Sequence, residues 1–451
     1  MQVKDLAKKR VTIMGLGLQG GGVGVARFLA QSGARVLVTD IKRKEELKGS
    51  LEKLKGLNVS YIFGKHRAKD FTDCDIVIKN PAVSLSSPYI SLAREKNIPI
   101  ESDVSLFFKL TKSQVIGVTG TKGKTTTANF IYEFLKEDYP CFLAGVAGGS
   151  PFDFFSKMSA KSIVVLELSS WQLELLATHQ LSPHGAVITN VYADHLNSYN
   201  TFDEYVQAKK NIFIFQKNED FLVLNEDDAI VNKFQSEAKG KVYAFGYNDI
   251  KKLEKIIPLD RILLKGKQNI MDVLAGFRVA KIYHIKDTRI SRVLETFKGV
   301  SYRQEFIREL RGVSFYNDTT ATIPEATLAA MESIATPIIL IAGGSDKKLD
   351  YTLFAQEIKR RAEIKKRAIP CVILFPGEAS EKIRSALIDL KYAKENILAV
   401  KTMAEAIQIA FTWARVGDSV LLSPGAASFS IFKNEFDRGD QFNAAVYNLP
   451  P

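Results

Sequence analysis

A short glycine-rich segment carries the strongest chemical signal in the sequence: Gly120-Thr121-Lys122-Gly123-Lys124-Thr125. It follows an apolar, strand-like run at 114–119 and opens a helix-like run in which Thr126 comes next. Backbone N–H groups of such a loop cradle phosphates, the lysine neutralises the terminal ones, and the hydroxyl after it holds Mg²⁺. The standard phosphate-loop spacing requires a further glycine where this chain has Val118. The shorter spacing is typical of a narrower set of ATP users, and the alternative is a purely structural turn.

Glu167 is a carboxylate within an otherwise apolar, strand-like run at 162–170. A charge there costs free energy unless it is paired or bound to a metal. A carboxylate on the strand that follows a phosphate loop is more often a magnesium ligand. The alternative is an ion pair with a lysine.

Lys209 falls on the wrong side of a predicted helix. The capping-box sequence at 201–204 predicts that a helix starts there. With helical spacing, Lys209 lies within one apolar stripe, whose members are Tyr205, Ala208, Ile212 and Phe213. Its neighbour Lys210 points away from the stripe and calls for no special role. On the helix pattern alone, a snorkelling or paired Lys209 is favoured over a chemically altered one.

His195 follows the strand-like run at 185–191, where a loop would cross the C-terminal edge of a sheet. A lone histidine in such a loop is usually just a polar residue. Its proximity to Glu167 and Lys209 in the expected fold makes it a candidate metal ligand.

A second glycine-rich segment, Gly15-Leu16-Gly17-Leu18-Gln19-Gly20, lies between a strand-like and a helix-like run, and Asp40 ends the next strand. This is the dinucleotide fingerprint in its required context, since the glycines let a diphosphate approach a helix N-terminus. A nucleotide-like diphosphate ligand is favoured. NAD itself and a tight turn without a ligand are the alternatives.

Polar residues and glycines also follow three strand-like runs in the last third of the chain, at 317–322, 343–347 and 423–428. Open α/β sheets bind ligands at such strand ends. Taken alone, these segments could equally be turns.

The elements that position these residues alternate in the manner of an α/β protein. Short β-branched runs alternate with helix-period segments, which predicts parallel sheets. Three blocks each contain a strand–glycine–helix signal, and we place the domains at 1–111, 112–299 and 300–451. Neither boundary is marked by a Pro/Ser linker.

Composition excludes several protein classes. The 451 residues favour two or three domains, and 46% hydrophobic with 25% charged residues excludes a disordered or fibrous chain. The net charge of +12 favours anionic partners, but the basic residues are spread along the chain, so nucleic acid is not expected. Three cysteines without a C-x-x-C pair imply neither a disulfide framework nor a zinc site.

The sequence gives no sign of a membrane segment. No apolar run approaches the ~20 residues that span a bilayer, and the first residues lack a signal-peptide core. We therefore expect a cytoplasmic protein without membrane insertion.

Together these segments resemble the Mur ligase family over essentially the whole chain. The segments GLGLQGGG, GTKGKTTT, LELSSWQLE, NVYADHLNSY, YVQAKKNIF, YNDTTAT, AGGSDK and LLSPGAASFSIFKN occur in the order and approximate spacing expected of the member that adds D-glutamate. The resemblance implies an N-terminal Rossmann-like domain that holds the UDP end of a sugar nucleotide. It further implies a central P-loop ATPase-like domain with a parallel sheet, and a C-terminal Rossmann-like domain that binds the amino acid and closes over both.

The resemblance also implies site residues. Matches to the ATP contacts are Gly120, Thr121, Lys122, Gly123, Lys124, Thr125, Thr126, Asn269, Arg303 and Asp318. Matches to the uridine-nucleotide contacts are Leu16, Gln19, Asp40, Asn80 and Pro81. Matches to the glutamate pocket are Thr322, Lys347, Ser428 and Phe429. The implied catalytic residues are Lys124, His195, Lys209 and Arg303.

Two Mg²⁺ ions are implied as well, with Mn²⁺ as an alternative metal. Thr125 and Glu167 would hold the first ion. Glu167, His195 and a carbamate on Lys209 would hold the second, which explains a lysine within an apolar stripe, because a carbamate is an anionic oxygen ligand suited to a hard cation.

The implied activity is ATP-dependent addition of D-glutamate to UDP-N-acetylmuramoyl-L-alanine in peptidoglycan synthesis. An acyl phosphate would be the intermediate, and ADP and phosphate the products. We expect a monomer.

Three departures from the family pattern bear on the substrate. Residues 146–150 replace the usual Gly-Asn-Ile-Gly, so an asparagine that meets substrate is missing. Residues 268–272 read Gln-Asn-Ile-Met-Asp for the usual His-Asn-x-x-Asn, and Thr320 replaces a lysine that approaches phosphate. The magnesium ligands and Lys124 are intact.

The rival functions are a related amino-acid ligase, a nucleotide-binding protein without turnover, and an NAD-binding protein. Folylpolyglutamate synthase lacks a first domain of the GLGLQG type, and LLSPGAASF favours the D-glutamate enzyme over its sister Mur ligases that add other amino acids. The intact residues Lys124, Thr125, Glu167 and His195 disfavour a vestigial phosphate loop.

Overall fold

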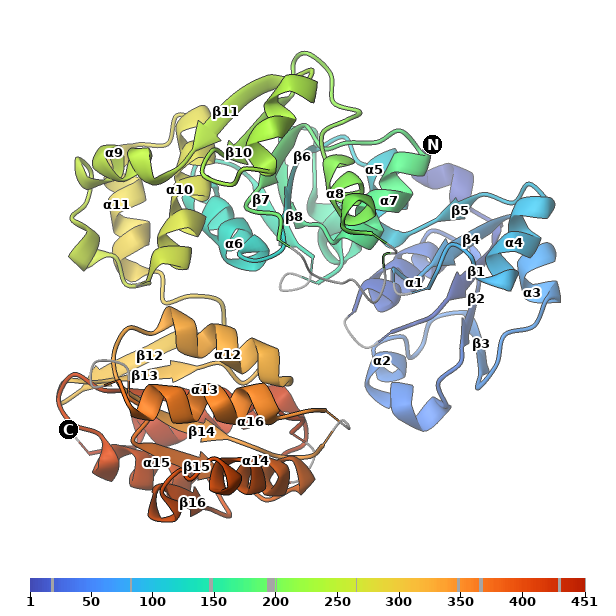
Figure 1. Cartoon of the computed structure of the whole chain (residues 1–451). Coiled ribbons are helices and arrows are strands. Elements are labelled where there is room, and N and C mark those ends of the chain that lie inside the picture. Colours follow the sequence, from blue (N-terminus) through green and yellow to red (C-terminus); the bar gives the residue numbers. More distant parts are fainter. Residues whose placement is uncertain are drawn as a thin grey trace. The chain divides into compact units, whose positions relative to one another are not determined.

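Three separate β-sheets organise the chain (Figure 1). The computed structural model describes residues 1–17, 20–81, 83–145, 149–192, 199, 201–264, 266–346, 349–364, 368–428 and 431–450. The α/β class and the three-domain organisation predicted from the sequence are confirmed.

The first sheet is parallel and has the order β3-β2-β1-β4-β5. Its strands are β1 (Arg10–Met14), β2 (Arg35–Asp40), β3 (Val59–Phe63), β4 (Ile76–Lys79) and β5 (Ile100–Glu101). Its helices are α1 (Gly21–Gln31), α2 (Lys48–Glu52), α3 (Lys69–Thr72), α4 (Pro88–Glu95) and α5 (Asp103–Leu110). Helices α1 and α5 pack in a large core on one face, and α3 and α4 in a smaller one with Met14 and Val77.

The central sheet is also parallel, with the order β11-β10-β9-β6-β8-β7. Its strands are β6 (Gln114–Thr119), β7 (Cys141–Ala144), β8 (Ile163–Glu167), β9 (Gly185–Ile188), β10 (Phe221–Asn225) and β11 (Lys241–Phe245). The accompanying helices are α6 (Lys124–Leu135), the 3₁₀ segments η3 (Pro151–Lys157) and η4 (Val231–Glu237), α7 (Ser170–Thr178), α8 (Phe202–Lys210), α9 (Ile250–Glu254), α10 (Lys267–Ile282) and α11 (Asp287–Thr296). Strands β8, β9 and β10 are buried at every position, as expected of parallel strands covered on both faces.

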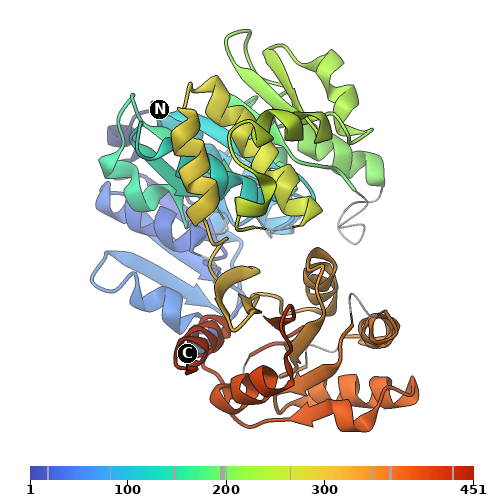
Figure 2. The same cartoon turned by 90° about the vertical axis from the view of Figure 1, so that its left-hand side faces the viewer.

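The third sheet is mixed, with the order β12-β13-β17-β14-β15-β16. Its strands are β12 (Glu305–Leu310), β13 (Val313–Asn317), β14 (Ile338–Ala342), β15 (Cys371–Leu374), β16 (Ile397–Ala399) and β17 (Ser419–Leu422). Its helices are α12 (Pro324–Ser333), α13 (Thr352–Ala362), α14 (Glu378–Asp389), α15 (Met403–Trp413) and α16 (Glu435–Tyr447). Helices α12 to α14 share one core and α15 and α16 another, so both faces are covered, as the turned view in Figure 2 shows. Only β12 runs antiparallel among the pairs described for this sheet.

By compactness the chain forms two units. The first comprises Met1–Ile256 and Met271–Ile290, and the second Ile257–Ile270 and Ser291–Pro451. One continuous core runs from the first sheet into the central domain. The domain boundaries at 111/112 and 299/300 stay predictions. In the described part of the chain, every helix is too short or too polar to cross a bilayer.

Candidate active site

The phosphate-type loop lies between β6 and α6, as predicted. Gly123 precedes the helix with a left-handed φ of 83°, and α6 begins at Lys124. The Lys124 ammonium turns back over the loop and donates to the carbonyl oxygens of Gly120 and Thr121, each at 3.1 Å. The Lys124 ammonium therefore lies above the backbone of its own loop.

Asn190, which follows β9, braces this loop and was missed by the sequence analysis. Its Oδ1 accepts from the Lys122 N–H at 2.8 Å and its Nδ2 donates to the Lys122 carbonyl at 3.0 Å. Its place directly after a strand next to β6 was a usable signal.

Thr125 and Glu167 meet at the carboxyl ends of the strands of the central sheet. Glu167 ends β8, beside β6, and the Thr125 hydroxyl donates to Glu167 Oε2 at 2.8 Å. Both residues are buried. Two oxygen ligands so close together suit a hard cation such as Mg²⁺.

Lys209 reaches the same loop from α8. The Thr201 hydroxyl caps this helix by accepting from the Glu204 N–H. Lys209 is 2% exposed, donates to the Gly120 carbonyl at 2.8 Å and lies 4.6 Å from the centre of the Tyr205 ring. The expectation that it lies in the apolar stripe is confirmed, and its ammonium is directed into the candidate site.

Lys210 differs from expectation. It is buried, because it lies over the Phe234 ring and forms an ion pair with Glu237. A single-helix pattern cannot reveal a second packed face. His195, the remaining predicted metal ligand, lies outside the described residues.

In the first sheet, the Asp40 carboxylate accepts hydrogen bonds from two backbone N–H groups. Its Oδ2 accepts from the Leu16 N–H and its Oδ1 from the Lys42 N–H, both at 2.9 Å. Asn80 Nδ2 donates weakly to the Gly15 carbonyl at 3.4 Å. Asp40 and Asn80 thus shape the loop after β1, with Pro81 half-buried beside it. Gln19 lies outside the described residues.

Asp318, after β13, is the most electrostatically perturbed carboxylate among the described site residues. Its Oδ2 accepts from the Ser423 hydroxyl at 2.7 Å and its Oδ1 from the Gln304 N–H at 3.2 Å. Burial raises the pKa of Asp318 to about 7, although these two bonds and the Arg303 charge act in the opposite direction.

The loops 317–322 and 423–428 lie together at this sheet edge. The Gly425 N–H donates to the Ala321 carbonyl at 2.9 Å. Thr322 is half-buried in the first loop and Ser428 is buried in the second. Lys347 and Phe429 lie outside the described residues.

Arg438 on α16, which the sequence analysis also did not single out, forms hydrogen bonds with both loops. It is fully buried and donates to the Thr319 hydroxyl and carbonyl at 2.9 and 2.8 Å and to the Ala426 carbonyl at 3.3 Å. Burial lowers the pKa of its guanidinium to about 10. It lies four residues before buried Phe442, so the stripe argument used for Lys209 would have found it.

The predicted residues therefore form two groups. Thr121, Lys122, Lys124, Thr125, Glu167 and Lys209 are brought together in the first unit, with Thr126 half-buried in the first turn of α6. Arg303 and Asp318 interact in the second, which also holds Asn269 at the start of α10.

Three models of Mur ligase domains match successive parts of the chain. The family model of the Mur ligase middle domain matches residues 118–270. The model of the Mur ligase MurD-like N-terminal domain matches 9–102, and that of the Mur ligase glutamate ligase domain matches 302–425. The UDP-N-acetylmuramoylalanine–D-glutamate ligase of Roseiflexus sp. (strain RS-1) is 38% identical, over 98% of this chain and 99% of its own.

The chain belongs to the Mur ligase family. A second relative with the same name, from Borreliella afzelii (strain PKo), is 37% identical over 99% of both chains. Solved Mur ligases share the fold. The alanine ligase MurC of Thermotoga maritima superposes with a TM-score of 0.58 at 20% identity, over 97% of this chain and 99% of its own. MurF of Acinetobacter baumannii superposes with a TM-score of 0.56 at 14% identity, over 99% of this chain and 98% of its own.

Proposed function

We propose that this Mur ligase is an ATP-dependent ligase that joins D-glutamate to UDP-N-acetylmuramoyl-L-alanine in peptidoglycan synthesis. The observation that carries the proposal is identity of 37–38% to ligases of that name along nearly the full length of both chains. The intact loop at Lys124 and its meeting with Glu167 supply the chemistry that such a reaction needs.

The reaction must overcome the poor electrophilicity of a carboxylate at neutral pH. Transfer of the γ-phosphoryl group of ATP to the carboxylate of the UDP precursor gives an acyl phosphate and ADP. The amine of D-glutamate then attacks the acyl carbon, the C–O bond to phosphate breaks, and the amide forms with loss of a proton. Lys124, and Arg303 in our proposal, offset the repulsion between the carboxylate and the γ-phosphate.

The donor set in the central domain fits magnesium, because the Thr125 hydroxyl and the Glu167 carboxylate converge within 2.8 Å in a buried place. We assign these two as ligands of one ion, with Glu167, His195 and a carbamylated Lys209 as ligands of a second ion and Mn²⁺ as an alternative metal. A bound Mg²⁺ would neutralise phosphate charge and act as a Lewis acid.

Carbamylation of Lys209 is supported by its position. In the neutral form its Nζ can attack CO₂, forming an N–C bond and releasing one proton. The product would place two oxygens near the Gly120 carbonyl that the amine now contacts.

The substrate contacts are assigned by their match to the motifs of the Mur ligase family. For the uridine nucleotide they are Leu16, Gln19, Asp40, Asn80 and Pro81. For ATP, beyond the loop Gly120–Thr126, they are Asn269, Arg303 and Asp318, and for D-glutamate Thr322, Lys347, Ser428 and Phe429. A monomer in the cytoplasm stays a prediction.

Thr320 departs from the family pattern, which has a lysine at this position, and therefore leaves a second function to be tested. Its hydroxyl donates to the Tyr302 carbonyl at 2.8 Å, so it braces the loop and supplies no charge in place of the usual lysine. A ligase for another amino acid, or a nucleotide-binding protein without turnover, is the competing function.

Phosphate release from ATP and Mg²⁺ with UDP-N-acetylmuramoyl-L-alanine, across a panel of D- and L-amino acids, decides among these. We expect turnover that requires both the UDP precursor and D-glutamate. Turnover with a different amino acid would retain the ligase and contradict the glutamate pocket. Absence of turnover with every amino acid, in protein shown to bind ATP, would favour the binding protein.

A further inference from the structure

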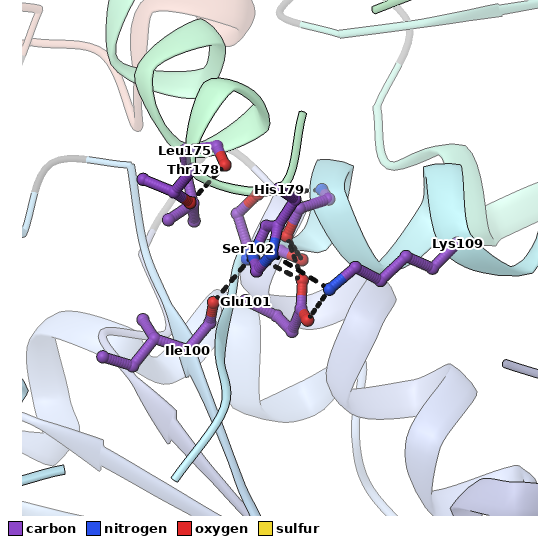
Figure 3. Close-up of polar contacts among 8 residues, drawn as sticks. Ile100, Glu101, Ser102, Lys109, Leu175, Thr178 and His179 are labelled. Carbon is purple, nitrogen blue, oxygen red and sulfur yellow. Dashed lines mark hydrogen bonds and ion pairs between the residues drawn. The ribbon is translucent and has the colours of Figure 1, made fainter. Parts of the chain in front are cut away.

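A buried carboxylate joins the first sheet to the central domain. The side chain of Glu101, at the end of β5, is 1% exposed, and Lys109 from α5 and His179 from the end of α7 converge on it (Figure 3). His179 Nε2 lies 3.2 Å from Oε2, Lys109 forms an ion pair with Oε1, and the Ser105 hydroxyl donates to Oε2 at 2.6 Å.

Lys109 and His179 also contact each other within this network. Lys109 Nζ lies 3.1 Å from His179 Nδ1. An ammonium only donates, so Nδ1 accepts from Lys109 and Nε2 is the donor nitrogen of the ring. That N–H faces Glu101 and the Ile100 carbonyl, 3.0 Å away. Burial acts to raise the pKa of Glu101, but the bonds from His179, Lys109 and Ser105 outweigh it and hold the pKa below its ordinary value.

The network connects the elements that lead to the two nucleotide sites. Helix α5 carries Lys109 and runs on to β6, which ends at the loop beginning with Gly120. Helix α7 follows Glu167 and ends next to His179. Strand β5 belongs to the same sheet as β2, whose last residue is Asp40.

The two domains also contact each other through apolar rings. The Phe28 and Phe107 rings pack against Phe152 and Phe155 with centroids 4.3–6.1 Å apart. Apolar contact is non-directional, so it brings the surfaces together without fixing their angle. A buried charge with several hydrogen-bond donors is directional and accepts one geometry.

We propose that Glu101, Lys109 and His179 are positioning residues for the ligation. They hold the UDP-binding sheet at one orientation to the ATP loop, so that the precursor carboxylate meets the γ-phosphate. The proposal rests on the proposed function. These residues act through α5 and α7 and not by touching a substrate.

The proposal has a specific kinetic consequence. A misplacement of about 1 Å between reacting groups costs up to about 100-fold in rate. The assigned UDP contacts, however, all lie in the first domain, and the assigned ATP contacts all lie outside it, so neither set spans the interface that the network joins. Loosening the network should therefore lower kcat and leave the separate affinities for ADP and for the UDP precursor unchanged.

The test uses the double variant Glu101→Gln/Lys109→Met, which removes both charges together. Removing one partner alone would leave a lone buried charge and destabilise the fold. We expect a melting temperature near that of the wild type, a kcat lower by about 10-fold or more, and unchanged dissociation constants for ADP and UDP-N-acetylmuramoyl-L-alanine by calorimetry.

Arg27→Met is the matched control at the same interface. Arg27 pairs with Asp153 at 3.1 Å, but the two side chains are 34% and 39% exposed, and such pairs contribute little. We expect its kcat and both affinities to equal those of the wild type.

If the double variant folds poorly, a second pair of variants at His179 tests the same proposal. Glutamine at 179 can donate to Glu101 and accept from Lys109 as the imidazole does, whereas alanine can do neither. His179→Gln should therefore retain more of kcat than His179→Ala.

Two results overturn the positioning role. One is a kcat for the folded double variant equal to that of the wild type. The other is a parallel loss of kcat, both affinities and stability, which indicates a structural role. Absence of turnover in the wild type overturns the proposed function instead. Positioning is then judged by how far ADP changes the affinity for the UDP precursor, and equal coupling in wild type and double variant overturns it.

Discussion

Lys209 is a buried amine whose chemical state can be observed directly. We expect a carbamate carbon signal in ¹³C NMR spectra of the protein in ¹³C-bicarbonate, because Nζ lies beside the phosphate-type loop. The signal should vanish in Lys209→Ala, and turnover should fall at least about 100-fold.

The adjacent lysine provides the control. Lys210→Gln removes a second buried amine, which pairs with Glu237. The signal should persist in this variant. Loss of the signal in both variants, or in neither, would contradict the assignment to Lys209.

Asp318 should make stability fall as the pH rises. Its pKa of about 7 in the folded chain lies above the ordinary value of 3.8, so the folded state binds the proton more tightly. The stabilisation is fully present below about pH 4 and is lost as pH rises to about 7, at about 1.4 kcal/mol per pKa unit. Thermal unfolding of the ligand-free chain between pH 4 and 7 should be flatter for Asp318→Asn than for the wild type.

The exposed carboxylate of Asp389 in the same unit serves as comparison. Asp389→Asn should keep the wild-type slope. If Asp318→Asn keeps it too, Asp318 is already ionised in the folded state over this range.

At the scale of elements, the turn into α6 depends on a glycine. Gly123 has a φ of 83°, and a Cβ added there would overlap the Asp272 carboxylate. Gly56 has the same strain, with a φ of 82°, but open space around it. Gly56→Ala should cost about 1 kcal/mol of stability and leave ATP binding intact, whereas Gly123→Ala should also weaken ATP binding by about 10-fold or more. Equal ATP affinities, measured by calorimetry, would show that the loop tolerates the displacement.

Elements with a regular pattern were predictable from the sequence. The apolar runs ending at Thr119, Glu167 and Leu422 became buried parallel strands, because β-branched runs suit strands covered on both faces. The antiparallel β12 was not predicted. Its direction follows from the two-residue turn Arg311-Gly312, where both residues have positive φ, a hairpin signal that was overlooked.

Site residues on a glycine loop or within an apolar stripe were likewise predictable. The long-range hydrogen bonds of Asn190 and Arg438 were not, although a local signal marked each of the two residues. Asn190 reaches the Lys122 backbone across 68 residues, and Arg438 reaches Thr319 across 119. Such pairings depend on the tertiary fold, which the local periodicity of hydrophobic residues does not reveal.

At the scale of the molecule, the proposed ATP contacts belong to both compact units. Lys124 and Glu167 lie in the first unit and Arg303 and Asp318 in the second. If all of them contact one ATP, the units must meet around it. We expect the radius of gyration from small-angle scattering to fall when a non-hydrolysable ATP analogue and the UDP precursor are added. An unchanged radius would count against closure.

The two units also interleave along the chain, since the first contains Met271–Ile290 and the second Ile257–Ile270. Helix α10 covers α6, where Gly276 lies so close to Phe130 that a larger residue would collide with it. A fragment ending at Ile256 would therefore leave the apolar side of α6 open to water. On the ribosome, the ATP-binding half cannot complete its core until the first residues of its neighbour have also been synthesised.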